Sequence, residues 1–248
     1  MKSLLRRFRR SEFAPRYLKR LERKQRILAG PFAGMAYHGE AVGSAATPKM
    51  LGTYELELVP LLNQWAAIPF TTIIDAGAAE GYYAIGCARM WPQAKVTAFE
   101  AQTEGRRMLE RNAQLNGVSD RVTISGLCNV ENLRAALNVP PPTLLIMDVE
   151  GAERELLDPA AVPEVANVYF IAEVHDCFIP NLGEVLSARL GASHELTEIW
   201  TRERIPEDFR YPRNSLLRRW MWLYLLQYAD ELRPGPMRWI CGVPRARH

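Results

Sequence analysis

Short runs of aliphatic and β-branched residues alternate with longer amphipathic segments along most of this 248-residue chain. A short apolar run between turn residues is typical of a buried strand, and apolar residues three or four positions apart are typical of a helix. The pattern predicts strands at 71–75, 95–100, 121–125, 144–148, 168–174, 195–200 and 237–243, with helices at 103–115 and 181–190 between them. Because such alternation is typical of a mostly parallel sheet covered by helices on both faces, we predict an α/β fold.

The first predicted strand ends on a carboxylate, Asp75, and glycines follow it before a helix resumes. Gly77 and Gly81 let the backbone turn tightly and let a ligand approach with no Cβ in the way. A dinucleotide would place its pyrophosphate at the start of this helix, where Glu80 would repel it. Asp75 and Glu80 suit a cation, so the loop favours S-adenosylmethionine, which carries a sulfonium and an ammonium, over NAD. The residues of this loop that we assign to the cofactor are Asp75, Gly77, Ala78, Glu80, Gly81 and Tyr82.

Two further regions extend the predicted cofactor site. Glu100 ends the second strand, where a carboxylate can accept hydrogen bonds from both ribose hydroxyls, and Ala101 follows it. Tyr54 precedes the first strand, in a segment that we expect to cover the cofactor together with Glu55. An alternative for this segment is purely structural, with Thr53 capping a helix and Glu55 in its first turn.

The ends of the fourth and fifth strands carry the candidate catalytic groups. The residues concerned are Asp148, Glu150, Glu153, Glu173, His175 and Asp176. Open α/β sheets bind ligands at the carboxyl ends of their strands, so these groups should face the methyl acceptor. We predict that His175 is the general base, because an imidazole can take a proton near neutral pH. Asp148 and Glu150 would orient the imidazole, bind the acceptor hydroxyl or act as bases themselves.

Two alternatives stay open at these strand ends. Asp148, His175 and Asp176 offer oxygen and imidazole ligands for Mg²⁺, Mn²⁺ or Zn²⁺, which would lower the pKa of an acceptor hydroxyl. We nevertheless predict no metal, because carboxylates near a sulfonium already have a purpose without one. The second alternative is structural, with Glu150 and Glu153 placed favourably near the positive end of a helix.

Between residues 73 and 176 the chain resembles the FkbM-type class I methyltransferases. The resemblance rests on Asp75-x-Gly77-Ala78-x-x-Gly81-Tyr82, the strand-end Glu100, Asp148-Val-Glu150-Gly151-Ala-Glu153 and Glu173-Val-His175. It implies a Rossmann-like seven-stranded sheet of order 3-2-1-4-5-7-6, S-adenosylmethionine as cofactor, and a hydroxyl acceptor on a sugar, a glycan or another small natural product. Ala79 departs from the pattern, since many methyltransferases have a glycine there.

Charge is distributed unevenly although the whole chain carries only +3. Residues 1–28 are crowded with Lys and Arg against only Glu12 and Glu22. We therefore divide the chain into a basic helical arm and cofactor-covering segment at 1–55, and a methyltransferase domain at 56–248 with a helical insertion at about 203–235. The arm would contact anionic membrane lipids or nucleic acid, or would pack on the domain or on a second subunit of a homodimer.

The helix expected at 216–228 within the insertion is rich in aromatic residues. A substrate lid, a dimer surface, a membrane-dipping element and ordinary packing on the sheet are all compatible with it.

Other features favour a soluble enzyme in the cytoplasm, peripheral to the membrane at most. No apolar run is long enough to span a bilayer, and four widely spaced cysteines without a C-x-x-C motif are typical of a reducing compartment. Two competing functions remain, an RNA methyltransferase or nucleic-acid-binding module that uses the basic arm, and a non-catalytic protein that binds S-adenosylmethionine. No Asn-Pro-Pro-Tyr-type motif supports the first, and the strand-end carboxylates and histidine argue against the second.

Overall fold

The computed structural model describes residues 25–38, 40–209, 226, 229–231, 233 and 235–245. The short helices predicted in the basic arm before residue 25 lie outside these residues, as does the helix predicted at 216–228 except for Leu226. Among the described helices, none is long and apolar enough to cross a bilayer.

Seven strands form one sheet in the order β3-β2-β1-β4-β5-β7-β6. Their bounds are β1 Thr72–Ala76, β2 Lys95–Phe99, β3 Val122–Ser125, β4 Thr143–Met147, β5 Tyr169–Val174, β6 His194–Trp200 and β7 Arg238–Pro244. The first five strands are parallel, whereas β7 runs antiparallel to both of its neighbours. The predicted fold class and strand order are thus confirmed.

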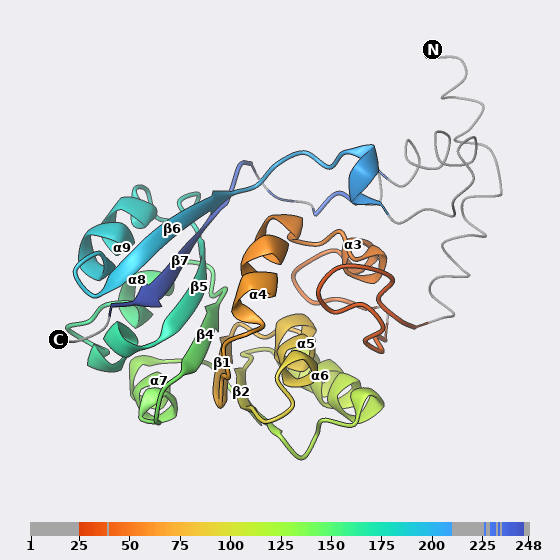
Figure 1. Cartoon of the computed structure of the whole chain (residues 1–248), viewed down its shortest axis with the longest axis horizontal. Coiled ribbons are helices and arrows are strands. Elements are labelled where there is room, and N and C mark those ends of the chain that lie inside the picture. The colour runs from red at the N-terminus through yellow and green to blue at the C-terminus, as the bar shows by residue number, and fades with distance from the viewer. Residues whose placement is uncertain are drawn as a thin grey trace, which may run out of the picture.

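Helices cover both faces of the sheet (Figure 1). On one side are α3 Ala46–Leu51, α4 Val59–Trp65, α5 Tyr82–Met90 and α6 Thr103–Asn116; on the other are α7 Val130–Leu137, α8 Glu153–Leu156 and α9 Leu182–Leu190. Short 3-10 helices lie at Leu56–Leu58, Pro163–Asn167 and Pro206–Asp208.

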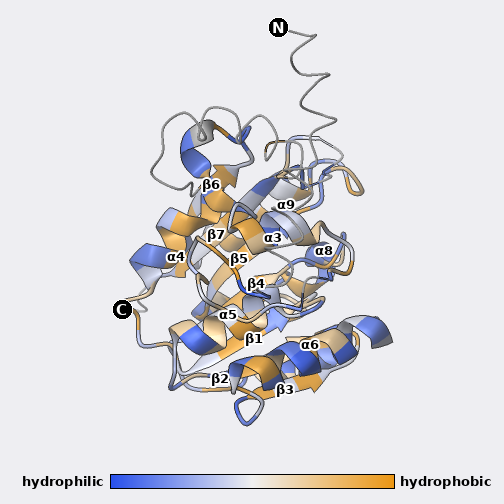
Figure 2. Cartoon of the chain, turned by 90° about the vertical axis from the view of Figure 1, so that its right-hand side faces the viewer, coloured by the Kyte–Doolittle hydropathy of each residue, from blue (hydrophilic) through white to orange (hydrophobic). Residues whose placement is uncertain are grey.

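Side chains that alternate along each strand build two separate cores. Ile73 and Leu144 belong to the core under α4 to α6, whereas their neighbours Ile74 and Leu145 belong to the core under α7 to α9. This is the consequence of period-two alternation in strands that are buried on both faces. In Figure 2 the strands are accordingly mostly hydrophobic, and hydrophilic and hydrophobic residues alternate along α6.

The described part of the N-terminal region packs against the first of these cores. Residues 25–38 form a compact loop closed by a bridge between Arg26 and Ala36, and Phe32, Met35 and Tyr37 are fully buried. Phe32 lies so close to α5 that a Cβ on Gly86 would come within 2.5 Å of its ring. Packing is therefore continuous across the boundary that we drew at residue 55.

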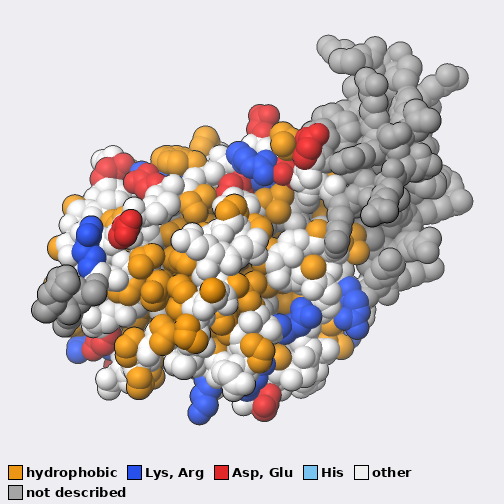
Figure 3. Space-filling model, in the orientation of Figure 1, with side chains coloured by type: hydrophobic (Ala, Val, Ile, Leu, Met, Phe, Trp, Pro, Cys, Tyr) orange, Lys and Arg blue, Asp and Glu red, His pale blue; other side chains and the backbone are white. Residues whose placement is uncertain are grey.

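Hydrophobic side chains gather in the middle of the face shown in Figure 3, and charged side chains surround them. Such a surface is compatible with a homodimer, and a second copy of the chain as partner remains a prediction.

Candidate active site

A pocket of about 380 Å³ lies at the carboxyl ends of the parallel strands. The strand-end residues that line it include Gly77, Ala78 and Ala79 after β1, Glu100 and Ala101 after β2, Leu127 and Cys128 after β3, Asp148 and Glu150 after β4, and His175 and Phe178 after β5. Lys49 and Tyr54 from the N-terminal region complete one wall, and Glu231 and Arg233 complete another. The volume lies within the roughly 300–1,000 Å³ typical of small-molecule sites.

The loop between β1 and α5 is built from left-handed residues. Gly77, Ala79 and Gly81 have φ angles of 88°, 48° and 92°. A Cβ on Gly77 would lie 1.7 Å from the carbonyl oxygen of Asp148. Gly77 is therefore required by the close approach of β4 as well as by its own conformation, and not only by a ligand. Ala79 adopts the left-handed conformation despite its Cβ, which costs roughly 1–2 kcal/mol.

Glu80 does not lie where we expected it. Glu80 precedes α5, which begins at Tyr82, and it does not line the pocket. It is fully buried, pairs with the ammonium of Lys49, and accepts hydrogen bonds from Tyr37 Oη at 2.6 Å and from the backbone N–H of Val42 at 3.0 Å. Because Lys49 offsets the charge of Glu80, the acidic character of the loop depends on Asp75.

Gly81 also stays outside the pocket lining, packed where a Cβ would lie 3.0 Å from the Leu109 side chain. The other residues that we assigned to the cofactor do line the pocket: Asp75, Gly77, Ala78, Tyr82, Glu100, Ala101 and Tyr54.

Asp75 is buried, and its Oδ2 atom has no hydrogen-bond partner among the described residues. Burial raises the pKa of Asp75 to about 7, and the charge of Glu100 adds to the rise against the opposing effects of the Ala84 N–H and Lys49. A buried acceptor without a partner costs about 1–3 kcal/mol. A ligand that offers an N–H or a cation would remove this cost.

Glu100 is held by the backbone on both oxygens. Its Oε2 accepts from the N–H of Ala79 at 2.8 Å, and its Oε1 accepts from the N–H of Gln102 at 2.6 Å. Each carboxylate oxygen has a second lone pair, so a fixed carboxylate with two free acceptor sites borders the pocket.

Tyr54 is buried, and its ring packs edge-on against Tyr82 at a centroid distance of 5.3 Å. Thr53 does not cap a helix, since its hydroxyl contacts the carbonyl of Pro48, and Glu55 precedes a 3-10 helix in a left-handed conformation. The capping alternative for this segment is therefore wrong.

His175 is buried beside the pocket and is oriented by Glu153, not by Asp148 or Glu150. Its Nδ1 lies 2.8 Å from Oε1 of Glu153, which is itself fully buried at the start of α8. The two oxygens of Glu153 also accept from the backbone N–H groups of Val149 and Gly151. A carboxylate used as an acceptor in this way requires Nδ1 to carry the proton, so Nε2 is the ring nitrogen left for chemistry.

The electrostatic environment favours a charged imidazole. Burial alone would lower its pKa, but the hydrogen bond and charge of Glu153, followed by the charge of Asp148, raise the pKa of His175 to about 8. The ring of Phe178 stacks on the imidazole with an interplanar angle of 4° and a centroid distance of 5.6 Å. His175 is thus held by a carboxylate at one ring atom and by an aromatic ring on one face.

The other acidic residues of these strand ends have distinct positions. Asp148 Oδ1 lies 3.5 Å from His175 Nε2, whereas Glu150 is exposed at the pocket edge in a left-handed turn with φ of 51°. Asp176 accepts from the guanidinium of Arg238 at 2.9 Å and from the N–H of Gly183 at 3.0 Å. Asp176 is therefore not available to the metal site that we considered as an alternative.

Glu173 takes the place that we assigned to Asp176 in that alternative. One ligand atom from each of Asp148, Glu173 and His175 lies within 4.8 Å of the others. Burial raises the pKa of Glu173 to about 7, with a further contribution from the charge of Asp148.

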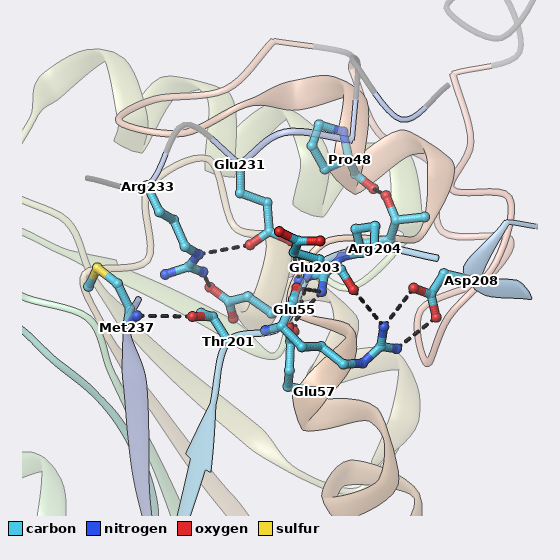
Figure 4. A network of polar contacts seen from close by, with 12 residues as sticks. Pro48, Glu55, Glu57, Thr201, Glu203, Arg204, Asp208, Glu231, Arg233 and Met237 are labelled. Atoms are coloured by element: carbon cyan, nitrogen blue, oxygen red, sulfur yellow. Dashed lines mark hydrogen bonds and ion pairs between the residues drawn. The ribbon is translucent and has the colours of Figure 1, made fainter. Parts of the chain in front are cut away.

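A network of buried ion pairs connects this side of the pocket to distant parts of the chain (Figure 4). The guanidinium of Arg233 pairs with Glu173 and donates to Glu55 and Glu231 at 2.9 Å each. It also lies over the ring of Trp239, 4.9 Å from the centroid. Described residues of the predicted insertion therefore reach the pocket wall.

Several residues of the site were missed in the sequence. Lys49 and Arg233 are isolated basic residues with no motif around them, so only their places in the folded chain distinguish them, Lys49 buried and Arg233 partly buried. Glu153 is interpreted in the sequence only as a carboxylate near the start of a helix. Its position two residues after Gly151 was the available signal for a turn that brings Glu153 back to the end of the strand.

No protein-family model and no curated protein matches this sequence. Solved structures do match it. A precorrin-6y C5,15-methyltransferase from Geobacter metallireducens is 14% identical with a TM-score of 0.48, over 76% of this chain and 86% of that one. An O-methyltransferase from Bacillus cereus in complex with SAH is 12% identical with a TM-score of 0.46, over 75% and 80% of the two chains.

A third match is TYW2 from P. horikoshii in complex with MeSAdo, at 14% identity and a TM-score of 0.41, over 73% of this chain. This chain spans 60% of the length of that protein. Similarities at this level do not carry an argument about activity, so the function is inferred from the geometry of the site.

Proposed function

We propose that the chain is an S-adenosylmethionine-dependent methyltransferase that methylates a hydroxyl group of a sugar, a glycan or a small natural product. The observation that carries the proposal is the Glu153–His175 pair, in which Glu153 engages Nδ1 and leaves Nε2 for a ligand in a pocket at the sheet edge where α/β folds bind ligands. The FkbM subtype remains part of the proposal and rests on the sequence resemblance alone.

The residues of the pocket fit the proposed donor. Asp75 offers a buried oxygen that needs a cationic or N–H partner, and Glu100 offers two fixed acceptor sites suited to a ribose diol. When bound, S-adenosylmethionine supplies an electrophilic methyl group. Asp75 would receive its ammonium and Glu100 its ribose hydroxyls.

The protein must then align the acceptor and remove one proton. His175 Nε2 takes the proton of the acceptor hydroxyl, while Glu153 keeps the proton on Nδ1 and stabilises the imidazolium that forms. Asp148, 3.5 Å from Nε2, adds a negative charge that stabilises the imidazolium formed by this proton transfer. Glu150 lines the pocket at its exposed edge, where it could contact only the outer part of an acceptor.

The test combines binding with transfer. Calorimetry with S-adenosylhomocysteine measures the donor site, and methyl-labelled S-adenosylmethionine incubated with fractionated cell extracts identifies the acceptor. We expect S-adenosylhomocysteine to bind with micromolar or tighter affinity. The labelled methyl group should appear in a fraction that contains hydroxyl compounds, and its bond should be stable to base. Absence of binding, or label confined to RNA, would contradict the proposal.

A metal-assisted form of the same reaction is the second candidate, favoured by the convergence of Asp148, Glu173 and His175. Carboxylate and imidazole ligands suit Mg²⁺, Mn²⁺ or Zn²⁺, and Glu153 would hold the imidazole from behind as carboxylates do in metal sites. Against it, Glu173 is already paired with Arg233. Transfer that survives EDTA supports the metal-free base, and transfer that EDTA abolishes and Mn²⁺ restores supports the metal.

A further inference from the structure

Lys49 is a buried cation on the wall of the pocket. It comes from α3, in the region before the first strand, and only 3% of its surface is exposed. Its ammonium pairs with Glu80, donates to Ser44 Oγ at 2.7 Å, and lies over the ring of Tyr54 at 4.8 Å from the centroid. Lys49 lines the pocket whereas Glu80 does not, so the lysine separates its own counter-ion from any ligand.

Besides the imidazole of His175, two basic side chains of the described residues line the pocket, and they differ in how many of their N–H donors remain free. Arg233 is engaged by three carboxylates, those of Glu55, Glu173 and Glu231. Lys49 has one carboxylate partner and one hydroxyl partner, although an ammonium has three N–H donors. Of these two described side chains, Lys49 is therefore the one with an unused donor for an anionic ligand group.

The orphaned oxygen of Asp75 lies in the same pocket and is an independent sign of a missing ligand. Asp75 is 3% exposed, and its Oδ2 has no hydrogen-bond partner among the described residues. Lys49 is close enough to affect the ionisation of Asp75. The Lys49 ammonium, which has an unused N–H donor, and Asp75 Oδ2, which has no partner among the described residues, thus border the same pocket.

We infer that Lys49 binds the carboxylate of the donor's amino-acid end, beside the ammonium that Asp75 receives. This inference rests on the proposed function, and it adds a residue from outside the strand-end motifs. One α-amino-acid group satisfies both sites because it carries an anion and a cation on one carbon. Lys49 also holds Glu80, which accepts from the N–H of Val42, so the same lysine connects the ligand to the segment that precedes α3.

The inference is tested with ligands that differ only at this end. S-adenosylhomocysteine carries both charged groups, 5′-methylthioadenosine carries neither, and decarboxylated S-adenosylmethionine differs from S-adenosylmethionine only by the lost carboxylate. Calorimetry on the full chain should show the wild type binding S-adenosylmethionine roughly tenfold or more tightly than its decarboxylated form, as a charge-assisted hydrogen bond requires. Equal affinity for these two ligands would overturn the inference, and no variant is needed for this measurement.

The variant that assigns the effect to Lys49 removes the buried pair as a unit, Lys49→Met with Glu80→Gln, so that no charge is left buried alone. It should lower the affinity for S-adenosylhomocysteine by roughly tenfold or more while changing that for 5′-methylthioadenosine by less than about threefold. The matched control is Glu80→Gln alone, which keeps the lysine and should retain or increase the preference for S-adenosylhomocysteine.

A parallel loss of both affinities in the double variant would show that Lys49 only anchors the N-terminal segment, and the inference would be wrong. The proposed function would survive that result, because the wild type would still bind both adenosine ligands. If the wild type binds none of the adenosine ligands, the donor assignment itself fails and takes the inference with it.

Discussion

The two halves of the pocket hold their carboxylates in different ways. At the ends of β1 and β2, Glu100 is fixed by backbone N–H groups of its own and the neighbouring loop. At the ends of β4 and β5, Glu173 shares Arg233 with Glu55, although Glu55 and Arg233 are 178 positions apart in the chain. In the donor half the carboxylate of Glu100 is therefore fixed by nearby loops, whereas the carboxylates of the acceptor half need a segment from across the chain.

The difference has an electrostatic consequence. Burial and the charge of neighbouring carboxylates raise the pKa of Glu55 and Glu173 to about 7 and that of Asp148 to about 6. The acceptor half thus holds three carboxylates and an imidazole that gain or lose protons near neutral pH, as acid–base catalysis requires, whereas in the donor half burial raises the pKa of Asp75 to about 7 with no imidazole beside it. Changes in the donor half should affect affinity, and changes in the acceptor half should affect rate and its pH dependence.

Replacing His175, in the acceptor half, should have the largest effect, a loss of methyl-transfer rate. His175→Ala removes the base, and we expect methyl transfer to slow by roughly 10²–10⁴-fold while affinity for S-adenosylhomocysteine stays nearly unchanged. Single-turnover transfer and calorimetry measure the two quantities. His38→Ala, in a loop outside the pocket lining, is the matched control and should leave both unchanged. A fully active His175→Ala variant would transfer the role of base to Asp148 or Glu150.

Replacing Glu100 should break the donor half. Glu100→Ala removes two charge-assisted hydrogen bonds, each worth about 1.5–3 kcal/mol, so S-adenosylhomocysteine should bind tenfold or more weakly. Glu104→Ala is the control, since Glu104 is exposed and, among the residues that the structure describes, pairs with Arg107 alone at 3.5 Å. Thermal unfolding of both variants checks that the loop remains folded. Unchanged affinity in Glu100→Ala would remove the ribose assignment.

The pH dependence sharpens the role of Glu153. The base must be neutral to accept a proton, and the pKa of His175 is raised to about 8, so the wild-type rate should rise with pH to a midpoint near 8. In Glu153→Gln the charge that favours imidazolium is lost, and we expect the midpoint to move down by about one unit. An unchanged midpoint would mean that Glu153 does not control this ionisation.

The raised pKa of His175 also affects the stability of the fold. Because the folded pKa of His175 lies above its ordinary value of 6.5, charged His175 stabilises the fold below pH 6.5, and this contribution is lost as pH rises through about 8. Chemical denaturation across this window should show a falling free energy of unfolding in the wild type and a smaller fall in Glu153→Gln.

The smallest predicted effect concerns Ala79. Its φ of 48° suits glycine, so Ala79→Gly should relieve backbone strain in the folded protein. Because this relief exceeds the entropy that glycine adds to the unfolded chain, we expect the free energy of unfolding to rise by up to about 1 kcal/mol. The control is Ala135→Gly on the exposed side of α7, where glycine should destabilise by about 1 kcal/mol. Denaturant titration measures both. Equal losses in the two variants would show that Ala79 is not strained.

The strands and helices of the core were predictable because their signals are local. The run before Asp75 and the run before Asp148 both became buried parallel strands. The helix predicted at 103–115 ends at Asn116, with Gly117 in the left-handed conformation after it. The positions of Asp75, Glu100, Asp148 and His175 on one pocket follow from the same logic, since parallel strands bring their carboxyl ends to one edge.

Side-chain partners inside the pocket were less predictable. Glu80 was assigned to the ligand from its place in the loop, yet it faces away from the pocket because Lys49, from a segment outside the motif, holds it in the core. Asp176 was grouped with His175 by adjacency, but adjacent residues after a strand diverge, and Asp176 turns toward Arg238.

The sequence by itself determined the sheet, the edge at which ligands bind and the histidine that faces it, because hydrophobic periodicity and strand-end position depend only on neighbouring residues. Which carboxylate orients His175 was decided by the tertiary structure. The left-handed turn at Glu150 and Gly151 leaves Glu150 exposed and returns Glu153 to the strand end, where two backbone N–H groups fix it against the imidazole. Several carboxylates lay within reach in the sequence, and only backbone angles and packing select among them.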